Sequence, residues 1–126
     1  MLLAIIYQPI YNMVVYLTYK ITIGSQYESR GCWKDRKTTP RTLTDIDIDI
    51  PKTFGSHYKK RKDPILHCLQ AAIARGYVVF ALQDGGQCFG SSSLKSYSKW
   101  GTSTDCARGL GGPLANDVYE IRNGNL

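Results

Sequence analysis

The stretch that decides the fold is Gly76-Tyr-Val-Val-Phe-Ala-Leu-Gln-Asp-Gly-Gly-Gln-Cys-Phe-Gly90. Its first half is β-branched, aromatic and apolar, which is the composition of a buried strand. The middle, Asp84-Gly85-Gly86, is typical of a turn, because glycine adopts positive φ at little steric cost. Cys88 and Phe89 then lie on a return strand. The stretch therefore predicts a β-hairpin.

The residues just before this hairpin predict a helix that covers it, since two strands alone are not stable in water. Asp63 suits the N-cap, and Pro64 suits the first helical position, where its missing N–H costs nothing. Apolar side chains then recur on one helical face: Ile65, Cys68, Leu69, Ala72 and Ile73. Gly76 suits the position just past the helix end. We expect Cys68 to point toward the sheet.

Two further strands are expected at the ends of the module. Residues 27–34 form the first strand and contain Gly31-Cys32-Trp33, and residues 116–121 form the last. Between the hairpin and the last strand we expect a loop, a short helix near Trp100 and a glycine-rich irregular segment. The predicted class is α+β, with one main helix packed on a small twisted antiparallel sheet that disulfides staple.

Composition limits the function classes. The chain has 126 residues, of which 43% are hydrophobic, so one globular domain is expected. The net charge of +6 favours polyanions or acidic surfaces. No motif that reads DNA or RNA accompanies this charge, so nucleic acid is not the expected partner.

The cysteines indicate the compartment. The chain has four, Cys32, Cys68, Cys88 and Cys106, and none belongs to a C-x-x-C pair. That spacing argues against a zinc ribbon and against a thioredoxin-like redox site. Two disulfides in an oxidising, extracellular compartment are the favoured interpretation, and four free thiols are the alternative.

Residues 1–24 differ from the rest of the chain. No charged residue precedes Lys20, and the segment nearly has the length of a membrane-spanning helix, although Pro9 interrupts it. It is interpreted as a signal peptide, a signal anchor, or a segment unrelated to the fold, such as a mispredicted start. The expected organisation is therefore this hydrophobic segment, a module over 25–121, and a frayed tail over 122–126.

Asp45-Ile-Asp-Ile-Asp-Ile50 alternates strictly. The pattern D-x-D-x-D opens a calcium-binding EF-hand loop, but the sixth position is Ile50 instead of glycine and the twelfth is Ser56 instead of glutamate. A half-buried strand with an acidic edge is the favoured interpretation, and no metal site is expected.

A basic run, Lys59-Lys60-Arg61-Lys62, follows this segment. It is a candidate contact for acidic polysaccharide or phosphate, or a cleavage site for a processing protease. A solvated loop or helix edge is the simpler explanation.

In order, the landmarks of the chain are Gly31-Cys-Trp-Lys-Asp35, the helix with Cys68, Gly76-Tyr-x-x-Phe-Ala-Leu-Gln83, Gly86-Gln-Cys-Phe89, Cys106 and Gly111-Gly-Pro-x-Ala-Asn-Asp-Val-Tyr119. This order resembles the WSC-type module in the short, cysteine-poor form of invertebrate extracellular multidomain proteins. The resemblance implies a secreted or membrane-tethered module of PAN/apple-like shape, with a helix on a curved antiparallel sheet. It also implies a role in carbohydrate binding.

Four cysteines allow three disulfide connectivities. The expected positions of the elements favour one of them. Cys68 faces the sheet from the helix and Cys88 lies on the strand beneath it, while Cys32 is on the first strand and Cys106 precedes the last. We therefore predict the pairs Cys68–Cys88 and Cys32–Cys106.

No catalytic constellation stands out in the sequence. His57 and His67 have no serine or cysteine nucleophile placed beside them, and Gly-x-Ser-x-Gly does not occur. We expect no enzyme activity and no cofactor, and a hydrolase fragment is only a distant alternative.

A sugar site needs an aromatic face for the C–H side of the ring and planar polar groups for its hydroxyls. Candidates for the aromatic face are Trp33, Trp100 and Tyr97, and candidates for the polar groups are Asp35, Gln83, Asp84, Gln87, Asn116 and Asp117. Four of them have a structural alternative: packing on a disulfide for Trp33, a place in the core for Trp100, and the shaping of a turn for Asn116-Asp117.

The sequence thus predicts a non-catalytic extracellular module that binds glycans or glycoproteins. The alternative is a structural or protein–protein interaction module of a surface or matrix protein. The exposure of the Trp33 and Trp100 rings distinguishes the two, since exposed rings beside polar side chains favour a sugar.

Overall fold

The computed structural model describes residues 12–15, 26–49 and 57–122. Most of the predicted hydrophobic segment 1–24 lies outside these ranges, and within them residues 12–15 form a helical turn. Of the predicted tail, residues 123–126 also lie outside. Among the described residues, no helix has both the length and the apolar character needed to cross a membrane.

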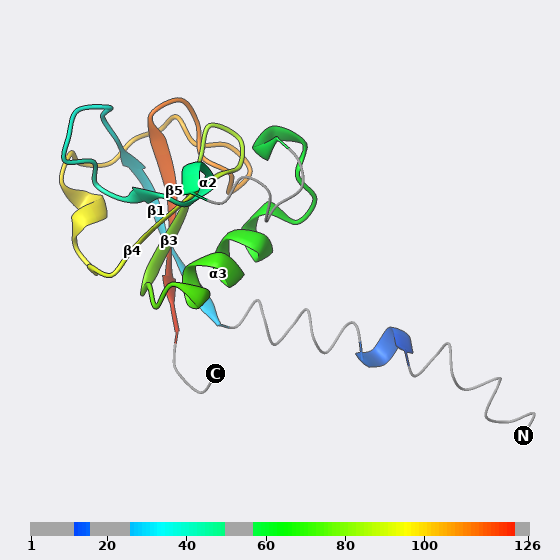
Figure 1. Cartoon of the computed structure of the whole chain (residues 1–126). Coiled ribbons are helices and arrows are strands. Elements are labelled where there is room, and N and C mark those ends of the chain that lie inside the picture. Colours follow the sequence, from blue (N-terminus) through cyan, green and yellow to red (C-terminus); the bar gives the residue numbers. More distant parts are fainter. Residues whose placement is uncertain (1–11, 16–25, 50–56, 123–126) are drawn as a thin grey trace, which may run out of the picture.

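The module is built on one antiparallel sheet of five strands in the order β1-β5-β3-β4-β2 (Figure 1). The strands are β1 (Tyr27–Lys34), β2 (Thr44–Asp45), β3 (Val79–Gln83), β4 (Gln87–Ser91) and β5 (Ala115–Ile121). The predicted hairpin is confirmed as β3 and β4. Its turn has positive φ at Asp84, Gly85 and Gly86, as the glycines indicated.

The predicted helix is α3 (Pro64–Ala74), which buries Cys68, Leu69 and Ala72 against β3 and β4. Pro64 begins the helix as expected. Asp63 occupies the N-cap position with a φ of 48°, but its side chain makes no capping hydrogen bond. Its backbone carbonyl instead accepts the N–H of His67 at 3.0 Å.

Every residue of β3 is buried, because both faces of the sheet are covered. On the helix side, Phe80 and Leu82 join Leu69 and Cys88 in one core cluster. On the other side, Val79 and Ala81 pack with Phe89, Val118 and Leu43, and Trp33 and Tyr97 pack against this second cluster. Tyr97 belongs to the short helix η3 (Ser96–Ser98), so the irregular segments after β1 and β4 cover the face that α3 leaves open (Figure 1).

The structure contains two disulfides, and they are the two expected pairs. Cys68–Cys88 joins α3 to β4 with a Cα–Cα distance of 5.4 Å, and Cys32–Cys106 joins β1 to the loop before β5 with a Cα–Cα distance of 6.0 Å. The module has no free cysteine.

Within the alternating segment Asp45–Ile50, the described residues 45–49 do not form the strand that the pattern predicted. Only Thr44 and Asp45 pair with β4, and Ile46–Asp49 form the single helical turn α2. Asp45 accepts the backbone N–H of Ile48 at 3.2 Å, a local bond that competes with the sheet ladder. Ile46 is consequently fully buried, whereas Ile48 is 74% exposed. Residues 50–56 of the calcium-loop comparison lie outside the described ranges.

Candidate functional site

Three of the predicted site residues meet in the interior. Gln83 on β3 lies opposite Asn116 on β5. Its Nε2 donates hydrogen bonds of 2.8 Å to both Asp35 Oδ2 and Asn116 Oδ1. All three side chains are at most 4% exposed. Gln83 therefore ties Asp35, which follows β1, and Asn116 on β5 to β3, and Asp35 and Asn116 do not present themselves to a ligand.

Asp35 is the acidic centre of this network. Arg41 donates from Nη2 to Asp35, Thr42 donates its hydroxyl at 3.2 Å, and the backbone N–H of Arg36 donates at 2.8 Å. Burial by itself raises the pKa of Asp35, but the hydrogen bonds from Arg41, Gln83 and Arg36 outweigh it, so the pKa lies below its ordinary value. The carboxylate thus stays ionised and fixes the position of Arg41.

An open pocket lies beside the β3–β4 turn, where Arg41 and Gln83 reach the edge of the network. Its volume is about 510 Å³. Three predicted site residues line it: Gln83, Asp84 and Gln87. The other lining residues are Lys37, Arg41, Asp45, Ile48, Tyr58, Pro113 and Leu114.

Hydrogen bonds orient the polar side chains of this pocket. The phenol of Tyr58 donates to Asp84 Oδ2 at 2.6 Å, and this bond, with a smaller effect of burial, raises the pKa of Tyr58 to about 12. The amide of Gln87 donates to Asp45 Oδ2 at 2.8 Å. Partial burial raises the pKa of Asp45 although hydrogen bonds to its carboxylate oppose the shift. The pocket therefore holds amides, carboxylates and a phenol in fixed orientations.

The sequence did not indicate Tyr58, Lys37 or Arg41 as parts of a site, and it raised Asp45 only as part of a calcium loop. Tyr58 and Asp84 are 26 residues apart, and Asp45 and Gln87 are 42 apart. No spacing rule relates residues on elements so far apart in the sequence, so only the folded chain brings them together.

The predicted aromatic face lies elsewhere and does not line this pocket. Trp33 donates its indole N–H to the Arg30 carbonyl at 2.7 Å, and its ring meets Tyr97 edge-on at 5.2 Å between centroids. Trp100 lies under the guanidinium of Arg36. Both tryptophans are half-buried. Trp33 and Trp100 therefore do not form one site with Gln83, Asp84 and Gln87.

Asp117 has a structural contact. Its Oδ2 accepts the backbone N–H of Gly111 at 2.8 Å, which ties the glycine-rich loop to β5. This is the turn-shaping role that the sequence left open for Asn116-Asp117.

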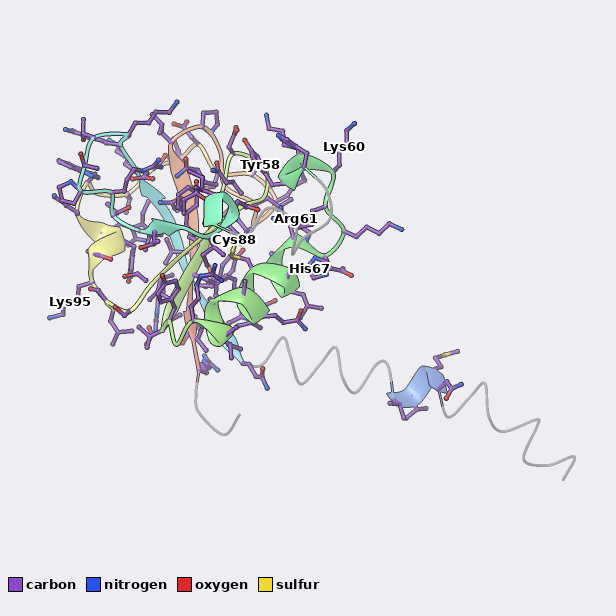
Figure 2. All side chains as sticks on the ribbon, viewed as in Figure 1. Tyr58, Lys60, Arg61, His67, Cys88 and Lys95 are labelled. Atoms are coloured by element: carbon purple, nitrogen blue, oxygen red, sulfur yellow. A yellow bond between two sulfur atoms is a disulfide. The ribbon has the colours of Figure 1, made fainter. Side chains whose placement is uncertain are left out.

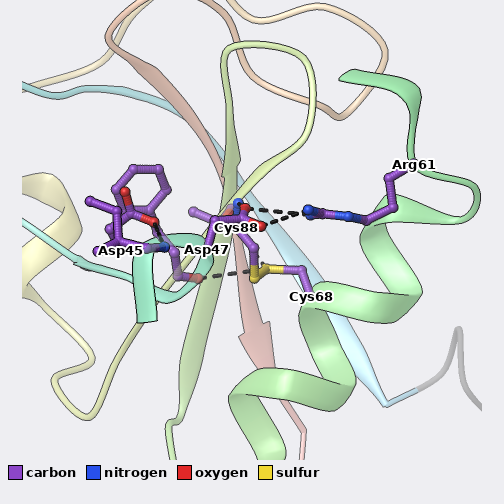
Figure 3. The surroundings of a disulfide bond; sticks show 8 residues. Asp45, Asp47, Arg61, Cys68 and Cys88 are labelled. Carbon is purple, nitrogen blue, oxygen red and sulfur yellow. Dashed lines mark hydrogen bonds and ion pairs between the residues drawn. A yellow bond between two sulfur atoms is a disulfide. The ribbon is translucent and has the colours of Figure 1, made fainter. Parts of the chain in front are cut away.

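The basic run is not a continuous patch. Arg61 is buried, and its guanidinium pairs with Asp47 through Nη2–Oδ1 at 2.6 Å and Nη1–Oδ2 at 3.4 Å (Figure 3). Lys59, Lys60 and Lys62 remain exposed, and Lys60 projects away from the module in Figure 2. Arg61 is therefore not available to an outside polyanion, and a contact through this run would depend on Lys59, Lys60 and Lys62.

The two histidines lie on separate elements: His57 Nδ1 accepts the N–H of Lys59 at 3.2 Å, and His67 lies on α3. In the part of the chain that the structure describes, no group of three or more His, Cys, Asp or Glu residues could hold a metal ion.

The pocket can therefore offer a small polar ligand directed hydrogen bonds from Gln87, Asp84 and Arg41, with Leu114 and Pro113 as an apolar border. No protein-family model matches the chain, and no curated protein matches its sequence.

Proposed function

We propose that this chain is a non-catalytic extracellular module that binds a glycan, or the glycan of a glycoprotein, in the pocket beside the β3–β4 turn. The observation that carries the proposal is the convergence of Asp84 and Gln87 on one open pocket, with the buried Gln83 also among its lining residues. These residues were selected from the sequence for their ability to bind sugar hydroxyls. The resemblance to WSC-type modules points to the same class of ligand.

The size and chemistry of the pocket support this class. A volume of about 510 Å³ lies within the range of small-ligand sites, which is roughly 300–1,000 Å³. Carboxylates and side-chain amides accept and donate in fixed planes, as neighbouring hydroxyls on a sugar ring require. Tyr58 is the aromatic side chain among the lining residues, and it takes the role that was expected of a tryptophan.

Two features support binding without catalysis. The lining residues include no serine, cysteine or histidine. Both carboxylates already accept structural hydrogen bonds, Asp84 from Tyr58 and Asp45 from Gln87. The extracellular assignment is supported by the pairing of all four cysteines, because such disulfides persist in oxidising compartments.

The test is a glycan array probed with the full chain made in an oxidising host. We expect one class of sugar to bind, and we expect Tyr58→Ala and Gln87→Ala to weaken that binding about tenfold. The first variant removes the aromatic face and the second removes a polar group, each worth roughly 1–2 kcal/mol. Gln70→Ala is the matched control, because Gln70 lies exposed on α3 away from the pocket. Binding that survives both pocket variants would place the ligand elsewhere.

A second candidate is a structural or protein–protein interaction module of a surface or matrix protein. The contacts of the tryptophans favour it, because Trp33 packs on Tyr97 and Trp100 packs under Arg36 within the module. A folded, fully disulfide-bonded chain that leaves the whole array blank would favour this candidate over glycan binding.

A further inference from the structure

Two cations meet on one aromatic ring at the opposite end of the module from the basic run. The guanidinium carbon of Arg36 lies 3.9 Å from the centroid of the Trp100 ring, and Nζ of Lys99 lies 4.9 Å from the same centroid. We call Arg36, Lys99 and Trp100 the Trp100 cluster. Both cations are exposed, and the ring is half-buried.

The two cations of this cluster form no ion pair with a carboxylate among the described residues, unlike five other arginines and lysines. In residues 12–15, 26–49 and 57–122, ion pairs with carboxylates within 4.0 Å involve Arg30, Arg41, Lys59, Arg61 and Arg122. Arg36 and Lys99 form none of these pairs, and both cations contact the indole ring of Trp100 instead. Their charge is therefore available to an anion from outside the module.

Stacking also prepares the Arg36 side chain for binding. A guanidinium held against an indole has lost part of its rotational freedom before a ligand arrives, which lowers the entropy that binding must remove. Its edge still carries N–H donors that match the oxygens of a sulfate or carboxylate. Lys99 adds a second positive charge over the same ring.

The Trp100 cluster does not line the proposed sugar pocket, but the chain connects the two directly. Lys37, the next residue after Arg36, lines that pocket and is exposed. Consecutive Cα atoms are about 3.8 Å apart, so positive charge extends from the pocket to Trp100 over a short segment of backbone. A polymer with one residue in the pocket could thus place a neighbouring anionic group against Arg36.

We propose that the Trp100 cluster binds the sulfate or carboxylate groups of an acidic polysaccharide. The choice of a polysaccharide as the anionic partner rests on the proposed function, because an extracellular module that binds glycans encounters acidic polysaccharides. It also moves the expected polyanion contact away from the basic run, where Arg61 is buried against Asp47 and Lys59 lies 3.7 Å from Asp84.

The experiment measures binding of the full chain to heparin, a sulfated uronic-acid polymer, and to the same polymer after desulfation. The test variant combines Arg36→Gln with Lys99→Gln. The control combines Lys60→Gln with Lys62→Gln, so it also removes two positive charges, but from the basic run. Lys60 and Lys95, a near neighbour of Lys99 in sequence, lie on opposite sides of the module (Figure 2).

We expect the Trp100 cluster variant to bind heparin at least about tenfold more weakly, since two charge-assisted contacts are lost, and the control to lose less than about threefold. Desulfation should weaken binding of the unmodified chain, and raising the salt from about 50 mM to about 300 mM should do the same. Arg36→Lys with Lys99→Arg keeps both charges and should retain most of the affinity.

Equal losses in the two double variants would overturn the proposal, because binding would then depend only on net charge. Tighter binding to duplex DNA than to heparin, with the same dependence on Arg36 and Lys99, would overturn the choice of polysaccharide. A chain that binds neutral sugars through Gln87 but not heparin would reject the Trp100 cluster and leave the proposed function intact. A chain that binds heparin through Arg36 while the Gln87 and Tyr58 variants change nothing would reject the pocket alone.

Discussion

Arg61 and Asp47 form a buried two-contact ion pair that joins the segment before α3 to the helical turn α2. Their side chains are 2% and 12% exposed. Asp47 also accepts the backbone N–H of Cys88 at 2.6 Å, so the pair is attached to β4 next to the Cys68–Cys88 disulfide (Figure 3). The ion pair thus holds together three segments that are distant in sequence.

Replacement of Arg61 by methionine should therefore strongly destabilise the module. Asp47 would lose its cation in a largely buried place, and breaking a buried pair from one side costs about 3–5 kcal/mol. Lys60→Met changes the neighbouring exposed cation and should alter the free energy of unfolding by no more than about 0.5 kcal/mol. The urea midpoints of the two variants measure this difference. A small effect of Arg61→Met would mean that water or another cation compensates Asp47.

Removal of the Gln83 amide should disconnect β3 from Asp35 and Asn116. Gln83→Leu keeps the approximate volume but leaves both acceptors without this donor, which costs about 1–3 kcal/mol for buried groups. Gln87→Leu, at the half-buried first position of the neighbouring strand β4, should cost less than about 1 kcal/mol. Thermal unfolding of the two variants compares them. Equal shifts in Tm would argue against a special role for the network.

Alanine at Gly111 should be far more damaging than alanine at Gly101. Both glycines have positive φ, 75° and 85°, so each substitution strains the backbone by about 1–2 kcal/mol. A Cβ at Gly111 would also collide with the backbone of Leu82 and Gln83, whereas a Cβ at Gly101 meets nothing within 4 Å. We expect Gly111→Ala to lower the free energy of unfolding by about 1–3 kcal/mol more than Gly101→Ala does, measured by urea unfolding. Similar values would show that the glycine-rich loop can move away from β3.

Acid should destabilise the module through Asp35. The pKa of this carboxylate is lower in the folded chain than in the unfolded chain, so its contribution is complete above the unfolded value of about 4 and is lost as the pH falls through the folded pKa. In Asp35→Asn, the free energy of unfolding should change less with pH in this acidic range. Urea midpoints measured at intervals below about pH 5 would show it.

Asp45 should show the opposite pH dependence of stability in the same experiment. Its folded pKa is raised, so its contribution is present below about pH 4 and is lost as the pH rises through the folded value. Asp45→Asn should therefore gain stability relative to the unmodified chain as the pH increases through that window. If the two aspartate variants shift the curve in the same direction, the burial and hydrogen bonding described for one of them are wrong.

The two disulfides should contribute unequally. They close segments with sequence separations of 74 and 20 residues. Loop-closure entropy then assigns about 4.5 kcal/mol to Cys32–Cys106 and about 3 kcal/mol to Cys68–Cys88. Paired alanine variants compared by urea unfolding test the order. If the loss of Cys68–Cys88 costs more, the packing of its fully buried sulfurs outweighs the entropy of the unfolded chain.

The sequence by itself determined the elements whose signals are local. Pro64 and the apolar spacing from Ile65 to Ile73 define α3, and the Asp84-Gly85-Gly86 turn defines the β3–β4 hairpin. These signals are reliable because helix spacing and positive φ act within a few residues. Once the helix and hairpin are placed, the Cys68–Cys88 pair follows.

The alternation over Asp45–Ile50 shows where a local pattern fails. The same residues suit a strand by period, but a bond from Asp45 to the Ile48 N–H starts a helical turn, and the ion pair with Arg61 holds Asp47 in place. The hydropathy pattern of a short segment cannot show a contact with a residue outside that segment, such as the ion pair of Asp47 with Arg61.

Only the tertiary structure decided which polar residues meet. It placed β3 between β5 and β4, which buries Asp35 and Asn116 with Gln83 but leaves Gln87 and Asp84 at an open pocket with Tyr58. It also separated Trp100 from that pocket and set Arg36 on its ring. The physical reason is that hydropathy and spacing describe the face of one element, whereas the partner of a polar side chain depends on which distant segments the sheet order brings beside it.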